Sequence, residues 1–212
     1  MLLAVLTVFV FGISPILGSA KLRSEIGLAF YALIAAASVS AVARRRSAVL
    51  AVGICAAASI ALDWIAYSHA GSTLEILDVA FRAGFVGAIA ITVTAQVFRP
   101  GEITHHRVQG AIVVYLLAGL AWGYLFEIIA LAHPGAFRVA DGSDPTFDSP
   151  GLFRYFSFAT LTTLGYGDVL PLTPLARSVA TLEAIIGQLY PTVMIARLIT
   201  LELSERRAGR VP

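Results

Sequence analysis

The chain has 212 residues, of which 58% are hydrophobic and 13% are charged, and its mean hydropathy is +0.84. A soluble domain carries about a quarter charged residues because its surface faces water, so this composition excludes an ordinary soluble protein and indicates a surface that faces lipid. The net charge of +2 is small, and the basic residues lie in short loops, so no nucleic-acid partner is expected. Cys55 is the single cysteine, which excludes an intrachain disulfide and a thiolate metal cluster. No cofactor is expected.

Apolar segments long enough to cross a membrane recur along the whole chain. A helix needs about 20 apolar residues to cross the hydrocarbon core. Six segments reach or approach that length: 2–18, 25–43, 47–68, 75–98, 108–132 and 174–203. They predict an all-α membrane protein with six transmembrane helices. The short first segment also resembles a signal peptide, but no basic residues precede it, which favours a retained span.

The basic residues between these segments indicate how the chain is oriented. Residues 44–46, 99–107 and 206–210 carry most of the Arg and His residues of the loops. If the helices simply alternate in direction, all three groups lie on one side, which the positive-inside rule makes cytoplasmic. Lys21 and Arg23 are the discordant pair. We therefore expect a multi-pass protein of the plasma (inner) membrane.

The longer connection 133–173 differs from the other loops. A polar stretch with Pro and Gly is followed by a short amphiphilic run, LFRYFSFATLTT, and then by LGYGDVLP. A half-length helix and a Gly-rich strand are tolerated at membrane depth only where protein or water surrounds them. The pattern therefore predicts a re-entrant loop that enters from the outside.

The sequence Thr162-Thr163-Leu164-Gly165-Tyr166-Gly167-Asp168 lies at the centre of this loop. A dehydrated cation needs oxygen atoms on all sides, and backbone carbonyls supply them when successive residues point theirs the same way. Alternating Gly makes that geometry accessible, since Gly enters the left-handed region without steric cost. An isolated Gly-Tyr-Gly is more often a turn, but its position between two spans and after a half-length helix favours a cation site.

These residues resemble the pore loop of the potassium-channel pore family, whose pattern is Thr-Val-Gly-Tyr-Gly-Asp. The resemblance covers about residues 108–203. It departs from the family at Leu164, where Val is usual, and at Ala159, where some bacterial members carry Glu. Four further residues stand at matching offsets: Pro171, Thr173, Arg177 and Gly187.

The first four apolar segments predict a four-helix scaffold over 1–100, and the resemblance implies a pore domain over 101–212. In the pore domain it implies an outer helix 108–132, a pore helix 151–162, a filter 163–168 and an inner helix 174–203. It also implies that four copies form one pore, a homotetramer whose further partners are membrane lipid and K⁺ ions. Filter carbonyls that hold K⁺ are implied for Thr163, Leu164, Gly165 and Tyr166, with Gly167 completing the strand. Thr162, Asp168 and Tyr155 are implied to support the filter, with the Tyr155 hydroxyl donating to Asp168.

The sixth segment carries the residues that we assign to the cavity and the gate. Gly187 matches the hinge of the family, and Pro191 removes a helical hydrogen bond. Gln188, Pro191 and Ile195 follow i, i+3 and i+7 spacing and are expected on one face toward the cavity. Glu183 is an acid within the span, and such residues are usually functional or paired. We expect it to form a hydrogen bond with the pore helix, with a Thr as the candidate partner, and not to contact the ion.

The fourth segment does not have the composition of a voltage sensor. A sensor needs several positive charges in one span, whereas this segment contains only Arg82, with Asp78 one turn before it. A static ion pair is the favoured interpretation.

A potassium-selective, passively conducting channel is therefore the predicted function, and a weakly selective monovalent cation channel is the alternative. A transporter with four pore loops in one chain is disfavoured because this chain has one such loop. An enzyme is disfavoured because no convergent His, Asp or Ser groups are evident within the spans.

Overall fold

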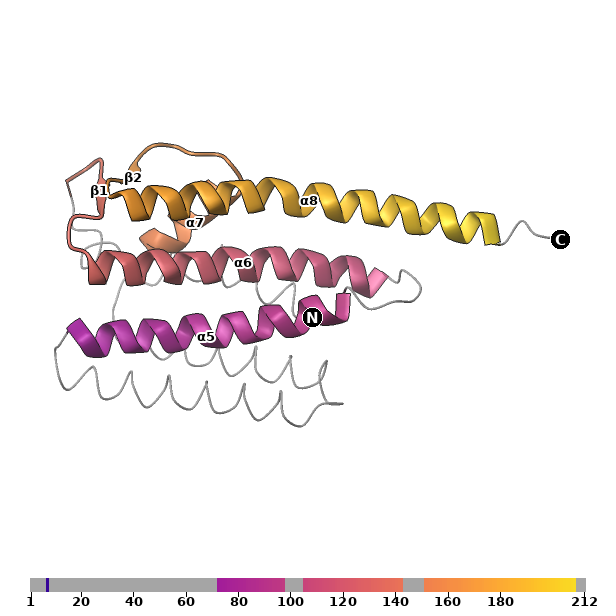
Figure 1. The fold of residues 1–212 in the computed structure, drawn as a ribbon, viewed down its shortest axis with the longest axis horizontal. Helices are drawn as coiled ribbons and strands as arrows, with labels where there is room; N and C mark the ends of the chain where they lie inside the picture. The colour runs from indigo at the N-terminus through magenta and orange to yellow at the C-terminus, as the bar shows by residue number, and fades with distance from the viewer. Residues whose placement is uncertain (1–6, 8–71, 98–104, 143–150, 209–212) are drawn as a thin grey trace.

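Three long helices run alternately in opposite directions, and a short helix lies between two of them (Figure 1). The computed structural model describes residue 7 and residues 72–97, 105–142 and 151–208. The long helices are α5 (Ser72–Val97), α6 (His105–Ala132) and α8 (Pro174–Ala208), and the short one is α7 (Leu152–Leu161). Within the described ranges, α5, α6 and α8 are long and apolar enough to cross a membrane.

These helices correspond to the fourth, fifth and sixth predicted spans. The predictions 75–98 and 108–132 differ from α5 and α6 by no more than three residues at either end. The prediction 174–203 begins at the observed residue, but α8 continues to Ala208. The predicted spans 2–18, 25–43 and 47–68 lie outside the described helices.

Local sequence explains where α6 ends and α8 begins. After Ala132 come His133, Pro134 and Gly135; Pro lacks the N–H that a continuing helix requires, and Gly135 adopts a φ of +82°. α8 begins with Pro174, whose fixed φ suits the first helical position. The Thr173 hydroxyl accepts a hydrogen bond from the Ala176 N–H at 3.3 Å and caps the helix.

α5 and α6 pack along most of their length. Their shared core contains eight buried side chains, with Phe158 of α7 among the residues packed against it. The eight are Val79, Phe85, Val86, Ile89, Val113, Leu117, Leu120 and Tyr124. The fourth span is therefore attached to the outer face of α6, on the side away from α8 (Figure 1).

Two short strands were not predicted from the sequence. β1 (Phe137–Val139) pairs antiparallel with β2 (Val169–Pro171). The expected all-α class is thus corrected to a mostly helical fold with one two-stranded sheet. Three-residue strands give too little alternation to be recognised, and their pairing depends on contacts between segments about 30 residues apart.

An aromatic cluster holds α7 against α6 and the sheet. The rings of Phe126 and Phe156 meet edge to face with centroids 4.9 Å apart, and those of Phe137 and Phe153 do so at 5.0 Å. All four side chains are buried. Because such pairs prefer defined ring geometries, the cluster fixes the position of α7 relative to its neighbours.

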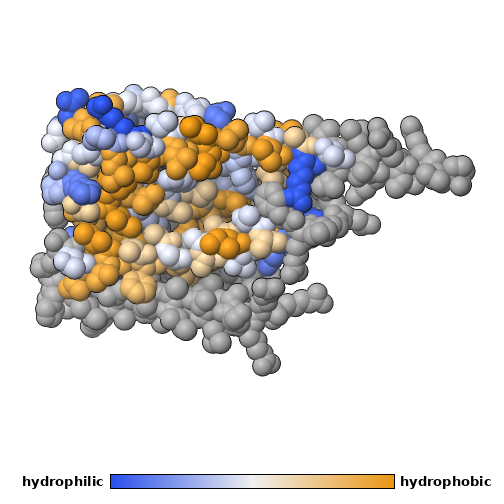
Figure 2. Space-filling model, viewed as in Figure 1, coloured by the Kyte–Doolittle hydropathy of each residue, from blue (hydrophilic) through white to orange (hydrophobic). Residues whose placement is uncertain are grey.

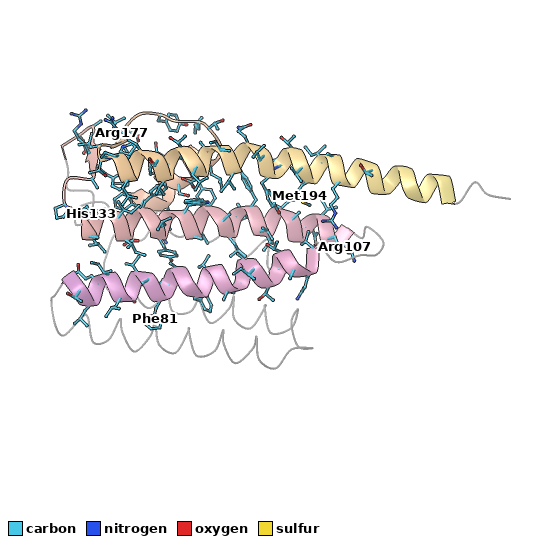
Figure 3. All side chains as sticks on the ribbon, viewed as in Figure 1. Phe81, Arg107, His133, Arg177 and Met194 are labelled. Carbon is cyan, nitrogen blue, oxygen red and sulfur yellow. The ribbon has the colours of Figure 1, made fainter. Side chains whose placement is uncertain are left out.

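The surface separates into an apolar middle and hydrophilic ends. Figure 2 shows apolar residues over the middle of the visible face and hydrophilic residues toward both ends of the described part. Figure 3 places His133 and Arg177 at one end of the bundle and Arg107 at the other. This distribution is expected for helices that cross a hydrocarbon layer with their polar ends in water.

Candidate functional site

The segment between α6 and α8 leaves and returns at the same end of the bundle. β1 follows α6 and β2 precedes α8, and their pairing sets Phe137 opposite Pro171. Between the strands, α7 starts after Gly151, which has a φ of +86°, and ends at Leu161, with Thr162 as its C-cap. The half-length helix lies between α6 and α8 (Figure 1). This is the path that the predicted re-entrant loop requires.

The backbone after α7 has positive φ at every second residue. φ is +58° at Thr163, +55° at Gly165 and +78° at Gly167, whereas Leu164 and Tyr166 are not in the positive region. Such alternation collects N–H groups on one side of the chain and carbonyl oxygens on the other. A row of carbonyl oxygens of this kind replaces the hydration shell of a cation. The two glycines adopt positive φ freely, but the β-branched Thr163 is strained there.

The N–H side of this strand is bonded back to α7. The Thr163 N–H donates to the Thr160 carbonyl at 2.9 Å. The N–H groups of Leu164 and Gly165 both donate to the Ala159 carbonyl, at 2.8 and 3.2 Å. Because the amides are satisfied on the α7 side, the carbonyls are left for the opposite side. The small side chain of Ala159, which departs from the family pattern, is itself buried.

The C-terminal end of the strand, at Tyr166–Asp168, is bonded to α7 and to the residue that follows β1. The Tyr155 hydroxyl donates to Asp168 Oδ2 at 2.7 Å, as the resemblance implied, and this bond raises the pKa of Tyr155 to about 12. Asp168 Oδ1 accepts from the Val169 N–H at 3.1 Å, and the Asp168 carbonyl accepts from the Ala140 N–H at 2.8 Å. The rings of Tyr155 and Tyr166 stack with centroids 6.3 Å apart. Side chain, ring and backbone therefore all fix this end.

The N-terminal end of the strand, at Thr163, contacts α8. Gln188 Nε2 donates to Thr163 Oγ1 at 2.9 Å. One residue earlier, Gly187 packs so closely that a Cβ added there would lie 2.0 Å from the Leu161 carbonyl oxygen. The Tyr115 hydroxyl of α6 donates to the same carbonyl at 3.2 Å. The end of α7 is thus held from both long helices.

A buried polar group joins α8 to the middle of α7. Glu183 and Ser157 are both fully buried. The Ser157 Oγ atom lies 2.5 Å from Glu183 Oε1 and 2.7 Å from the Gly119 carbonyl oxygen of α6. The expected hydrogen bond from Glu183 to the pore helix is therefore confirmed, but the partner is a Ser instead of a Thr.

Comparison with known proteins identifies this module. The family described as "Ion channel" matches residues 110–202. The inward rectifier potassium channel Kirbac3.1 of Paramagnetospirillum magnetotacticum is 35% identical over 96 residues, which cover 45% of this chain and 27% of that protein. The two pore potassium channel c of Oryza sativa subsp. japonica is 34% identical over 95 residues, which cover 43% of this chain and 19% of that protein. Residues 110–202 thus match an ion-channel family and are similar to parts of two potassium channels. The alignments span less than a third of either relative, and no solved structure matches the chain significantly.

The matched range contains the whole of α7, the alternating strand and most of α6 and α8. Together with the three apolar helices, it points to a multi-pass membrane protein. The first half of the chain, which includes α5, lies before the matched range. Its predicted role as a scaffold stays a prediction.

The residues predicted to support the filter lie around the strand. Thr162 is the C-cap of α7, and its hydroxyl donates to the Phe158 carbonyl at 2.6 Å. Tyr155 and Asp168 are joined as described. Leu164, which departs from the family pattern, is 57% exposed in the single chain, so its larger side chain meets no crowding there. The roles of these residues in conduction stay predictions.

The residues assigned to the cavity and the gate occupy one stretch of α8. Gln188, Pro191 and Ile195 are all exposed in the single chain, but so are Leu189 and Val193 between them, so exposure does not single out a cavity face. α8 passes through Pro191 as one helix. Gly187 is buried against the carbonyl of Leu161, so close packing already accounts for a glycine at this position. The hinge stays a prediction.

The side chains that hold α7 and α8 against α6 were not predicted from the sequence. Tyr190 of α8 donates to the Ala111 carbonyl at 2.9 Å, and its ring stacks on Tyr115 with centroids 5.8 Å apart. Ser157 was also missed. A lone Ser within an apolar amphiphilic run is a usable signal for a buried hydrogen bond. The two tyrosines are 75 residues apart and gave no such signal.

Proposed function

We propose that the chain is a subunit of a potassium-selective channel in the plasma membrane, in which four identical copies surround one pore. K⁺ passes through it passively, and the filter is formed by the carbonyl oxygens of residues 163–166. The observation that carries this proposal is the alternation of φ at Thr163, Gly165 and Gly167. Both relatives are named as potassium channels, which supports the choice of ion.

The geometry of the strand supports an assembly of several copies around one axis. One strand presents its carbonyl oxygens on one side only, while an ion without water needs oxygens all around it. Several strands must therefore face one another across an axis, and four of them make the stacked oxygen cages of a potassium filter. The carbonyl end of α7 lies beside this strand, and its partial negative charge favours a cation nearby.

Exposed apolar side chains support assembly. Tyr166 is 67% exposed in the single chain, and Leu164 is 57% exposed. Neither side chain belongs in water at the mouth of a pore, so neighbouring subunits are expected to cover them. α8 also exposes several large apolar residues for subunit or lipid contact: Leu175, Leu182, Ile185, Ile186, Leu189, Val193 and Ile195.

The test is ion flux into vesicles that contain the purified protein, measured in K⁺ and then in Na⁺. The informative variant is Gly165→Ala. Nothing lies within 4 Å of a Cβ at this position, so the added methyl acts only through the φ of +55°. Gly135→Ala is the matched control, because φ there is +82° and the space is equally open, but the residue lies outside the strand. We expect selective flux to be lost in Gly165→Ala and retained in Gly135→Ala, with both variants tetrameric.

Two results would contradict the proposal. Equal flux of K⁺ and Na⁺ through the unmodified protein would favour the weakly selective cation channel. Unchanged selectivity in Gly165→Ala would show that the alternating backbone is not the filter. The number of subunits is measured by the mass of the cross-linked protein in detergent. A ring with any number of subunits other than four would contradict the fourfold arrangement.

A further inference from the structure

We propose that Gln188 positions the hydroxyl of Thr163 at the inner end of the strand and thereby sets how strongly the innermost cation site holds its ion. This inference rests on the proposed function, because it assigns Thr163 to a conducting filter. It goes beyond that function by giving a role in ion occupancy to a residue of α8. Gln188 is a positioning residue here: it acts through Thr163 and not through direct contact with the ion.

The first observation is the contact itself. The amide nitrogen of Gln188 lies 2.9 Å from Thr163 Oγ1, so α8 makes a side-chain hydrogen bond to the strand 25 residues before it. Both residues are exposed in the single chain, so the rest of the chain does not cover the contact. The amides of Leu164 and Gly165 face the Ala159 carbonyl of α7, and we take the Thr163 hydroxyl to lie on the opposite side of the strand, with the carbonyl oxygens.

The second observation is the strain at Thr163. It is the single non-glycine residue with positive φ in the described part of the chain, with a φ of +58°. A β-branched residue rarely adopts this conformation, and it persists only when its surroundings hold it there. The N–H of Thr163 is held by the Thr160 carbonyl, and its side chain is held by Gln188. The backbone and the hydroxyl are thus fixed from different helices.

The chemistry of the hydroxyl decides what this contact does. A threonine hydroxyl has one hydrogen and two lone pairs. An amide N–H from Gln188 occupies one lone pair, so the second lone pair remains for a cation. Without the amide, the hydroxyl is free to rotate and to turn its hydrogen toward the site, which weakens cation binding. Gln188 therefore keeps Thr163 in the orientation of a ligand.

The contact is close to a rigid part of α8. Gly187, the preceding residue, is seated against the Leu161 carbonyl, and α7 ends at that residue. The amide of Gln188 is consequently placed by backbone packing and not only by its own flexible side chain. This makes the geometry of the inner site depend on where α8 lies.

The test measures block of K⁺ efflux by Ba²⁺ applied from the cytoplasmic side of the reconstituted channel. Ba²⁺ is close to K⁺ in size and carries twice the charge, so it reports the strength of the inner site. Gln188→Met keeps the length of the side chain and removes the donor. We expect the Ba²⁺ concentration for half block to rise about tenfold, the effect of losing a typical hydrogen bond. Gln188→Leu should behave alike, and both should remain tetrameric because the side chain is exposed.

A matched control variant and a double-mutant cycle separate the positioning role of Gln188 from a general structural role. Thr192→Val changes an exposed polar residue one turn further along α8, whose hydroxyl bonds only to the Gln188 carbonyl of its own helix, and should leave Ba²⁺ block unchanged. Thr163→Ala should weaken block as Gln188→Met does, and the double variant should be no weaker than Thr163→Ala alone. Unchanged block in Gln188→Met, or additive effects in the double variant, would overturn the inference. Absence of selective K⁺ flux in the unmodified protein would instead overturn the proposed function.

Discussion

Ser157 and Glu183 form a buried pair whose hydrogens can be counted. Ser157 Oγ lies within hydrogen-bond distance of both Glu183 Oε1 and the Gly119 carbonyl oxygen. A hydroxyl has one hydrogen, and a carbonyl only accepts. Both contacts are hydrogen bonds when Ser157 donates to Gly119 and a protonated Glu183 donates to Ser157. Glu183 Oε2 is buried and has no partner among the described residues, which a neutral carboxyl tolerates far better than a carboxylate.

We therefore expect Glu183→Gln to leave the channel folded and conducting, since the amide also donates to Ser157 and is neutral. Ser157→Ala should lower the free energy of unfolding by about 1–3 kcal/mol, because it strands two buried polar groups. Thermal melting of the tetramer in detergent measures the stability of both variants, and K⁺ flux into vesicles measures conduction by Glu183→Gln. A Glu183→Gln variant that is less stable than Ser157→Ala would contradict a neutral Glu183.

Sequence patterns predicted the parts of the fold that depend on short-range signals. The apolar lengths located α5, α6 and α8, and Pro174 marked the start of α8. The hydrogen bond between Tyr155 and Asp168 could be predicted because the resemblance covers both positions. The β1–β2 pairing and the tyrosine contact between α6 and α8 were not available, because each joins segments distant in the chain. Tertiary packing, and not local propensity, decides such contacts.

At Gly187 the structure shows a reason for a glycine that was not predicted from the sequence. A glycine within an apolar helix was interpreted as a hinge, but the structure shows its Cα facing the Leu161 carbonyl. No sequence pattern reports which backbone atom approaches a glycine, since that depends on the crossing of α7 and α8. A glycine in a helix indicates either flexibility or close approach, and only coordinates separate the two.

Gly187→Ala should disrupt the contact between α7 and α8. A Cβ at this position would lie 2.0 Å from a backbone oxygen, so one of the two helices must move. We expect a loss of about 1–3 kcal/mol or more in stability, together with reduced K⁺ over Na⁺ selectivity because the strand follows α7 directly. Gly84→Ala is the control, since a Cβ there meets nothing within 4 Å. Equal melting temperatures for the two variants would contradict the close contact.

The Tyr155–Asp168 bond should make the outer end of the filter insensitive to moderately alkaline pH. The bond raises the pKa of Tyr155 from 10.0 to about 12. A raised pKa means that the fold favours the protonated hydroxyl, so its contribution is complete below pH 10 and is lost as pH rises through about 12. We expect the K⁺ over Na⁺ flux ratio to stay constant from about pH 7 to pH 10. Tyr155→Phe should lower that ratio at every pH, whereas Tyr155→Trp, which retains an N–H donor, should retain more of it. A ratio that already falls below pH 9 in the unmodified channel would argue against this bond as the support.

Arg82 and Asp78 lie one turn apart on α5 and form a two-point ion pair, with Arg82 Nη2 2.6 Å from Asp78 Oδ2 and Nε 3.2 Å from Oδ1. A charge moved across the membrane is worth about 2.3 kcal/mol per 100 mV, and steep gating needs several such charges in each subunit. A single Arg paired within its own helix carries its counter-charge with it, so it contributes little net charge movement. We expect conductance to vary only shallowly with voltage, and Arg82→Gln to leave that shallow dependence unchanged. Current recorded across planar bilayers over a range of voltages measures both. A steep activation curve that flattens in Arg82→Gln would make α5 a working sensor.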